Sequence, residues 1–207
     1  ARPVIGKHLL LIFNTVLKTF YVPSVWKDNI LTPIYKSGSV DDPDNYRGIA
    51  VGSCVCKLFS KLLNIRLEQK IVSEGLISEN QGSGKRGSRT ADHLLIVKFL
   101  IDKYVNIKGG KLFVCFVDLK KCFDKIPRDL LFYTILKNYS IGGQFLKVIK
   151  EFYNKNQIFV KVSGGLCKPF ESTKGVLQGE INSPLLFNLF IDKITKNFDN
   201  SCDPVSI

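Results

Sequence analysis

One carboxylate stands directly after an apolar run, and its position suggests metal-assisted chemistry. Residues 112–117 are all apolar, and Asp118 follows them. A carboxylate beside buried neighbours is costly unless it is paired or bound to a metal ion. Strand-end carboxylates of this kind can serve metal-assisted phosphoryl transfer. The alternative is that Asp118 only caps the turn after the strand, and the residues alone leave both interpretations open.

An aromatic residue and a second carboxylate come shortly afterwards, at Phe123 and Asp124. Phe123 could be an ordinary core aromatic. Asp124 could pair with a nearby cation, Lys120, Lys121 or Arg128, for a purely structural reason. Neither residue therefore assigns a function when taken by itself.

A polar turn near the C-terminus offers a second group of candidates, Gln178-Gly179 and Ser183-Pro184. Glycine lets another backbone or a ligand approach closely, and Gln supplies both donors and an acceptor. Ser is a good N-cap and Pro suits the first helical position, so a helix begins here. A plain strand-to-helix turn would explain the Gly, Ser and Pro equally well.

Hydrophobic periodicity predicts the elements that position these residues. The expected helices cover 4–20, 54–73, 89–105, 128–138 and 142–153, with one more from Ser183. An extended stretch is expected at 29–35, broken by Pro33, followed by a loop over 36–48. Strands are expected at 111–119, 157–162 and 169–174. The unbroken apolar run in the first of these predicts a strand buried on both faces, with Cys115 as a buried thiol.

Composition limits the class of protein. The 207 residues are 45% hydrophobic and 23% charged, which excludes a disordered or collagen-like chain. No apolar run approaches the roughly 18 residues of a membrane span, and no secretory signal opens the chain. The length suits one large domain or two small ones. Because the chain starts Ala-Arg-Pro and contains no Met, we expect an internal piece of a longer protein.

The formal net charge of +12 suggests a polyanionic partner, of which nucleic acid is the commonest. Solvated lysines that keep the protein soluble are the alternative. The six cysteines form no CxxC pair and the two histidines are far apart, so we expect no zinc site. Unpaired cysteines favour a reducing, intracellular compartment, with nucleus or cytoplasm left open.

Two long segments resemble reverse transcriptases of the non-LTR retrotransposon type. Residues 116–127, FVDLKKCFDKIP, are similar to the first catalytic motif of that family, and residues 175–191, GVLQGEINSPLLFNLFI, to the second. Upstream, residues 34–36 and 45–49 resemble the start of the family's fingers, and residues 57–61 and 66–67 the helix that follows. The order and spacing agree over about residues 26–192.

The resemblance implies an α+β fold: right-hand polymerase fingers plus a partial palm, with an antiparallel sheet backed by helices. Residues 1–110 would be the fingers-like, mostly helical part, and residues 111–207 the partial palm. The implied function is RNA-directed DNA polymerase, with an RNA template, a DNA primer and dNTPs as partners and Mg²⁺, or Mn²⁺, as cofactor. No membrane or zinc is implied.

The resemblance also implies residue roles. Asp118, with the backbone carbonyl of Leu119, would hold the metal ions. Phe123 would be the steric gate against a 2′-hydroxyl. The remaining nucleotide contacts would be Gln178, Gly179, Lys36, Arg47 and Lys85, and the nucleic-acid contacts Arg86, Arg89, Ser183 and Pro184. A solvated basic loop is the alternative for the cations near residue 85.

The sequence departs from the family in three places. Residues 81–87 lack the usual Gly-Phe-Arg, and Glu180-Ile181-Asn182 replaces Asp-Pro-Leu. The family's third motif, an aromatic-Ala-Asp-Asp box, does not occur in the 207 residues. We therefore expect that this chain alone does not polymerise. Two alternatives share these features: a non-catalytic nucleic-acid-binding remnant of a decayed or co-opted element, and an intron-encoded reverse transcriptase that also aids splicing.

Overall fold

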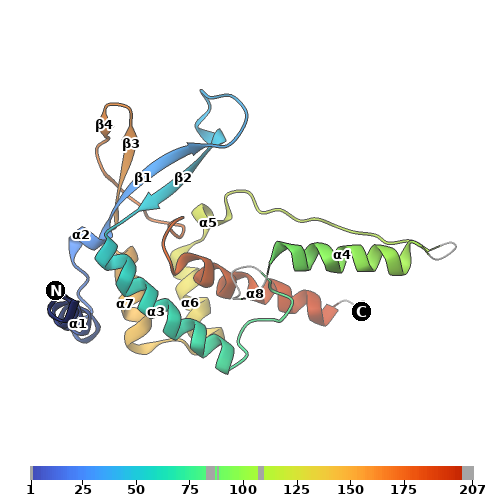
Figure 1. Cartoon of the computed structure of the whole chain (residues 1–207), viewed down its shortest axis with the longest axis horizontal. Helices are drawn as coiled ribbons and strands as arrows, with labels where there is room; N and C mark the ends of the chain where they lie inside the picture. The colour runs from blue at the N-terminus through green and yellow to red at the C-terminus, as the bar shows by residue number, and fades with distance from the viewer. Residues whose placement is uncertain (1, 83–86, 88, 107–109, 202–207) are drawn as a thin grey trace.

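The long predicted helices are present in the computed structural model, which describes residues 2–82, 87, 89–106 and 110–201 (Figure 1). The predicted helices at 4–20, 54–73, 89–105, 128–138 and 142–153 agree with the observed ones to within two residues at either end. None of the helices described is long and apolar enough to cross a membrane. The helices are α1 (Arg2–Thr19), α2 (Ser24–Lys27), α3 (Cys54–Ser73), α4 (Thr90–Tyr104), α5 (Cys122–Lys125), α6 (Arg128–Tyr139), α7 (Gly143–Tyr153) and α8 (Ser183–Ser201).

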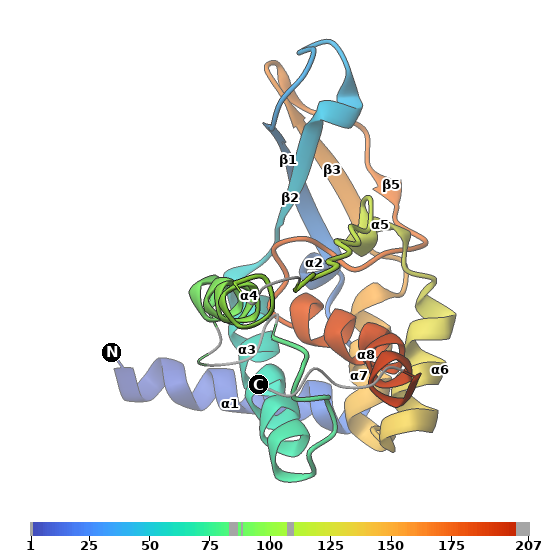
Figure 2. The ribbon, with the colours of Figure 1, turned by 90° about the vertical axis from the view of Figure 1, so that its right-hand side faces the viewer.

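The strands form one sheet that projects from the helices as a long hairpin with a neighbouring ribbon (Figure 2). β1 pairs antiparallel with β2 and parallel with β3, and β3 pairs antiparallel with β4 and β5. The antiparallel arrangement that we predicted for the strands at 157–162 and 169–174 is confirmed by the β3–β5 pair, whereas the β1–β3 pair makes the sheet mixed. The strands are β1 (Asp28–Tyr35), β2 (Tyr46–Val51), β3 (Gln157–Val162), β4 (Gly165–Leu166) and β5 (Phe170–Glu171), and a short 3₁₀ helix covers Pro43–Asn45.

Two details of the sheet follow from its pairing. A parallel pair needs a long crossover, and residues 36–156 supply one between β1 and β3. Pro33 does not break β1, because β1 pairs with β3 only from Asp28 to Leu31. At Pro33 the strand has a neighbour on one side only, where a missing N–H is tolerated. The sheet thus joins strands from both sides of the predicted boundary at residue 110, and that boundary stays a prediction.

The hydrophobic core lies among the helices, and aromatic rings tie its N-terminal half to α7. The ring of Phe59 in α3 lies 5.0 Å from that of Phe13, 5.7 Å from that of Trp26 and 6.0 Å from that of Phe152. Aromatic pairs at these separations stabilise beyond their buried area. The core continues into α6 and α8, where Leu131 and Leu189 are fully buried. This core supplies the rigid base on which the following loops are held.

The predicted buried strand at 111–119 is wrong. The chain from 110 to 119 has no regular secondary structure and runs extended from α4 to α5 (Figure 1). Phe113, Phe116 and Val117 are 90%, 84% and 79% exposed, and the predicted buried thiol of Cys115 is exposed as well. An apolar run becomes a strand only when other strands pair with its backbone. None of the pairings between described strands includes this segment.

Candidate active site

The turn after Asp118 leads into the short helix α5. Asp118 and Leu119 lie in the exposed segment before it, and Lys121 adopts a left-handed backbone conformation at the helix start, with φ 52°. No ion pair between described side chains includes Asp118. Its carboxylate is therefore exposed to solvent and has no ion-pair partner among the described residues.

Phe123 is held by the helix that carries the second motif. Its ring stacks on that of Phe187 in α8, with centroids 4.8 Å apart and planes 17° from parallel. Phe123 is partly buried against the core. This packing fixes where the ring stands beside the 175–179 loop, and the role of Phe123 as a steric gate stays a prediction.

Asp124 binds the second motif instead of a nearby cation. Its Oδ1 accepts a hydrogen bond from Nε2 of Gln178, 3.3 Å away. Of the three cations considered for it, Lys121 pairs with Asp44 at 2.6 Å, and the guanidinium of Arg128 turns to other acceptors. The contact joins residues 54 positions apart, and no local pattern indicates it.

The 175–179 loop is clamped between α5 and β2 by its backbone. Gly175 N donates to Ile126 O and Val176 N to Phe123 O, both at 2.8 Å. Gly175 has φ +79°, and a Cβ there would lie 2.7 Å from the carbonyl oxygen of Asp124. Only glycine combines this conformation with such a close approach. The first and second motifs therefore meet through main-chain contacts.

The other end of the loop meets the sheet. Ala50 N in β2 donates to Gln178 O at 2.7 Å. Gly179 has φ +104°, and a Cβ there would lie 2.4 Å from Ala50 O. Gln178 and Gly179 thus sit where the hairpin meets the helical part. The structure brings Phe123, Gln178 and Gly179 together, as predicted for a single site.

The predicted basic residues lie further out. Lys36 and Arg47 are exposed on the β1–β2 hairpin, and Arg89 is exposed before α4, where its backbone N donates to Asp92. Lys85 and Arg86 lie outside the described residues. Their role in phosphate binding stays a prediction.

The two residues predicted at the start of α8 differ in exposure. Ser183 is 1% exposed, and its hydroxyl lies 3.4 Å from that of Tyr153. Pro184 is exposed. The buried serine thus contacts protein here, and a contact of either residue with nucleic acid stays a prediction.

Arg128 is a residue of the site region that the sequence did not single out. It is 8% exposed, and its guanidinium donates to Gly175 O at 2.8 Å, Tyr153 O at 3.1 Å and Asn156 Oδ1 at 3.2 Å. It also donates to the carbonyl and hydroxyl oxygens of Ser172 and to Lys174 O. Burial lowers the pKa of this group below its ordinary value. Arg128 therefore anchors the stretch that enters the loop, although an Arg after a Pro reads as an ordinary solvated helix start.

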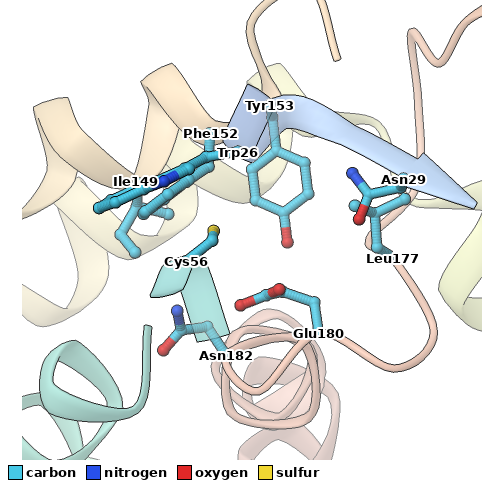
Figure 3. Close-up of a pocket in the computed structure, with 9 residues that line it drawn as sticks. All are labelled: Trp26, Asn29, Cys56, Ile149, Phe152, Tyr153, Leu177, Glu180 and Asn182. Atoms are coloured by element: carbon cyan, nitrogen blue, oxygen red, sulfur yellow. The ribbon is translucent and has the colours of Figure 1, made fainter. Parts of the chain in front are cut away.

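A small cavity with a mixed polar and apolar lining lies behind the loop (Figure 3). Its volume of about 20 Å³ is room for about one water molecule. The Tyr153 hydroxyl is directed at the side chain of Glu180, and Cys56 and Asn182 lie beside it. Burial raises the pKa of Glu180 above its ordinary value, and that of the Cys56 thiol to about 12. Glu180 Oε1 and Asn182 Oδ1 are buried without a hydrogen-bond partner among the described residues.

The donors available for a metal ion are of the right kind but few. A carboxylate at Asp118 and a backbone carbonyl at Leu119 are the hard oxygen ligands that Mg²⁺ prefers. Within the described residues, no group of three or more His, Cys, Asp or Glu side chains could hold a metal ion together. The described residues thus supply some of the ligands of such a site, at Asp118 and Leu119, but not a complete set.

Comparison with known proteins agrees with the motifs. Residues 34–206 match the family described as reverse transcriptase (RNA-dependent DNA polymerase). The chain is 25% identical over 185 residues to the probable RNA-directed DNA polymerase from transposon BS and 27% over 186 residues to that from mobile element jockey, both of Drosophila melanogaster. These matches cover 88% and 89% of this chain but 20% of each relative, so the chain spans about a fifth of their length.

A solved structure supports the architecture. Apo telomerase from Candida tropicalis, truncated from its C-terminal domain, superposes with a TM-score of 0.54 at 15% identity. The match covers 94% of this chain and 45% of that one. At this identity the likeness shows the fold alone. The chain thus shares the arrangement of helices and sheet seen in that protein.

Proposed function

Because the chain belongs to the reverse transcriptase (RNA-dependent DNA polymerase) family, we propose that it is part of the RNA-directed DNA polymerase of a non-LTR retrotransposon. One observation carries the proposal: the first and second motifs close on each other. Val176 N donates to Phe123 O, and Gln178 Nε2 donates to Asp124 Oδ1. This places an aromatic ring, a carboxylate and a glycine-containing loop around one spot. Residues 1–110 act as fingers and residues 111–207 as part of the palm.

The metal-binding role falls to the exposed edge of the site. Asp118 and the Leu119 carbonyl would hold Mg²⁺, or Mn²⁺, in the parent protein. A divalent ion there would lower the pKa of the primer hydroxyl and neutralise phosphate charge. The carboxylate suits this role because no described side chain pairs with it.

The other residues bind and orient substrates. Phe123, fixed by its stack on Phe187, excludes a 2′-hydroxyl and so selects deoxynucleotides. Gln178 and Gly179 face the incoming nucleotide. The triphosphate is bound by the cations Lys36, Arg47 and Lys85, and the template and primer strands by Arg86, Arg89, Ser183 and Pro184.

The 207-residue chain alone is inactive in this proposal. Two-metal transfer needs more carboxylates than Asp118 supplies, and within the described residues there is no cluster of metal-ligating side chains. The third motif is also absent from the sequence. Primer extension by the purified chain is therefore expected to fail with RNA template, DNA primer, dNTPs and Mg²⁺.

The test uses the full-length parent protein in the same assay. Asp118→Ala should abolish incorporation, whereas Asp41→Ala, a change at another exposed carboxylate, should leave it intact. Phe123→Val should increase incorporation of ribonucleotides relative to deoxynucleotides. Incorporation that survives Asp118→Ala would refute the assignment of the metal carboxylate.

A second function is favoured by the departures from the family at residues 82–86 and 180–182, and it agrees with the net charge of +12. In that case the chain is a non-catalytic nucleic-acid-binding remnant. Such a protein has no use for nucleotides. Mg²⁺-dependent binding of a dNTP by the parent protein supports the polymerase. A parent protein that binds RNA but shows no binding of dNTP supports the remnant.

A further inference from the structure

A basic cleft lies beside the polymerase site, between the start of α6, the end of α7 and the segment after β5. Figure 2 shows these elements together on one side of the molecule. The cleft has a volume of about 770 Å³. Neither Phe123, Gln178 nor Asp118 lines it. Ser172 and Lys174 line both this cleft and a smaller pocket that includes Gln178, so the two regions are neighbours.

The lining of the cleft is predominantly cationic. Lys125, Lys150, Lys155 and Lys174 contribute four ammonium groups, and all four residues are exposed. None of them takes part in an ion pair between described side chains. With Arg128 the cleft has five basic side chains, against two acidic ones, Asp129 and Glu171. A surface of this kind attracts polyanions.

The floor of the cleft holds a buried positive charge. Every hydrogen-bond acceptor of the Arg128 guanidinium is neutral: four backbone carbonyls, the Asn156 amide and the Ser172 hydroxyl. Among the described residues, no carboxylate neutralises this group by direct contact. Its field therefore extends into the cleft. An anion in the cleft would be stabilised both by this buried charge and by the lysines above it.

We propose that this cleft binds the phosphodiester backbone of a nucleic-acid strand, outside the nucleotide site. The four lysines come from separate segments and line an open cleft, which suits an extended chain of phosphates better than one small anion. The rings at the floor, Phe132 and Tyr153, are 6% and 7% exposed. They cannot stack on bases, so the binding is independent of sequence. The inference concerns backbone binding only and does not depend on catalysis.

The test compares two matched double variants of the 207-residue chain. Lys150→Gln/Lys155→Gln removes two charges from the cleft. Lys18→Gln/Lys61→Gln removes two exposed charges, also without ion pairs, from α1 and α3. Circular dichroism verifies that both variants keep the fold. Fluorescence anisotropy with labelled oligouridylate, over a range of KCl concentrations, gives the Kd and its dependence on salt.

The cleft variant is expected to lower the magnitude of the slope of log K against log salt by about 1.4, because each phosphate contact on a single strand contributes about 0.7. If the affinities converge at 1 M salt, this slope change corresponds to about 25-fold weaker binding at 0.1 M salt. The control variant should change both values much less. Equal effects of the two variants, or no effect of the cleft variant, would overturn the proposal.

Two further outcomes decide between related ideas. If oligoglutamate competes with the RNA as effectively as unlabelled RNA does, the cleft recognises acidic peptide and the proposal is wrong. If the parent protein shows no polymerase activity but the cleft variant still loses RNA affinity, the proposed enzyme function fails while the cleft assignment stands. The polymerase can likewise be active when the cleft assignment fails.

Discussion

Replacing Arg128 by Met removes the donor that joins four parts of the chain: the start of α6, the end of α7, Asn156 and the stretch 172–175. Met is shorter than Arg but keeps an unbranched apolar stem. Three of the acceptors, Gly175 O, Tyr153 O and Asn156 Oδ1, belong to buried residues and would lose this partner. The acceptors of the more exposed residues in the 172–174 stretch can turn to water in the open cleft.

The size of the loss follows from those three acceptors. A buried acceptor left without its partner costs about 1–3 kcal/mol. Asn156 is affected most, because its Nδ2 already lacks a partner among the described residues. Removing the buried charge also removes its desolvation penalty, which offsets part of the loss. We therefore expect the free energy of unfolding to fall by about 3–4 kcal/mol, a large share of the roughly 5–15 kcal/mol of a typical domain.

Urea unfolding followed by fluorescence measures this change, because Trp26 is the single tryptophan and is 7% exposed. Arg128→Lys keeps the charge but loses the planar fork of donors, so it should fall between wild type and Arg128→Met. Arg66→Met, at an exposed position of α3, is the control and should change stability by about 0.5 kcal/mol or less. A loss below about 1 kcal/mol for Arg128→Met would refute this account of the guanidinium.

Three further predictions concern the loop and the cavity behind it. Gly175→Ala should lower the free energy of unfolding by about 2–4 kcal/mol, because the new side chain adds left-handed strain and overpacking. Gly164→Ala is the control, and it should cost less than about 1 kcal/mol because the space around Gly164 is open. Equal urea midpoints for the two variants would contradict the clamping of the 175–179 loop. Because burial raises the pKa of Glu180, the unfolded chain ionises first, and the contribution of Glu180 to stability declines as pH rises above about 4.5. Relative to wild type, Glu180→Gln should therefore gain stability as pH rises, as read in urea titrations at several pH values. Burial raises the pKa of Cys56 to about 12. Iodoacetamide at about pH 8 should therefore label exposed Cys115 but not Cys56 in the folded chain, as read by peptide mass spectrometry. Equal labelling would show that Cys56 is accessible.

The helices and the order of the motifs could be predicted from local sequence. A periodic apolar stripe is a property of one segment, so α3 could be predicted with its observed bounds and α1, α6 and α7 nearly so. The two motifs are also local strings, and the match over residues 34–206 confirms the family that they indicated. The contacts of Val176 with Phe123 and of Gln178 with Asp124 join the two motifs, and the nucleotide-binding roles that the resemblance implies for Phe123 and Gln178 stay predictions.

Features that depend on partners distant in sequence could not be predicted and were found in the folded chain. The apolar run at 111–119 reads as a buried strand, yet it is exposed, because burial and pairing require neighbours that the run does not itself encode. The sequence offered Arg128 only as a possible partner of Asp124 and Glu180 only as part of a departure from the family motif, yet Arg128 organises the loop and Glu180 lies against a small cavity. Their partners are tens of residues away, or come from several elements at once. Local sequence sets the propensity of a segment, but the environment of a side chain is set by the elements that fold against it.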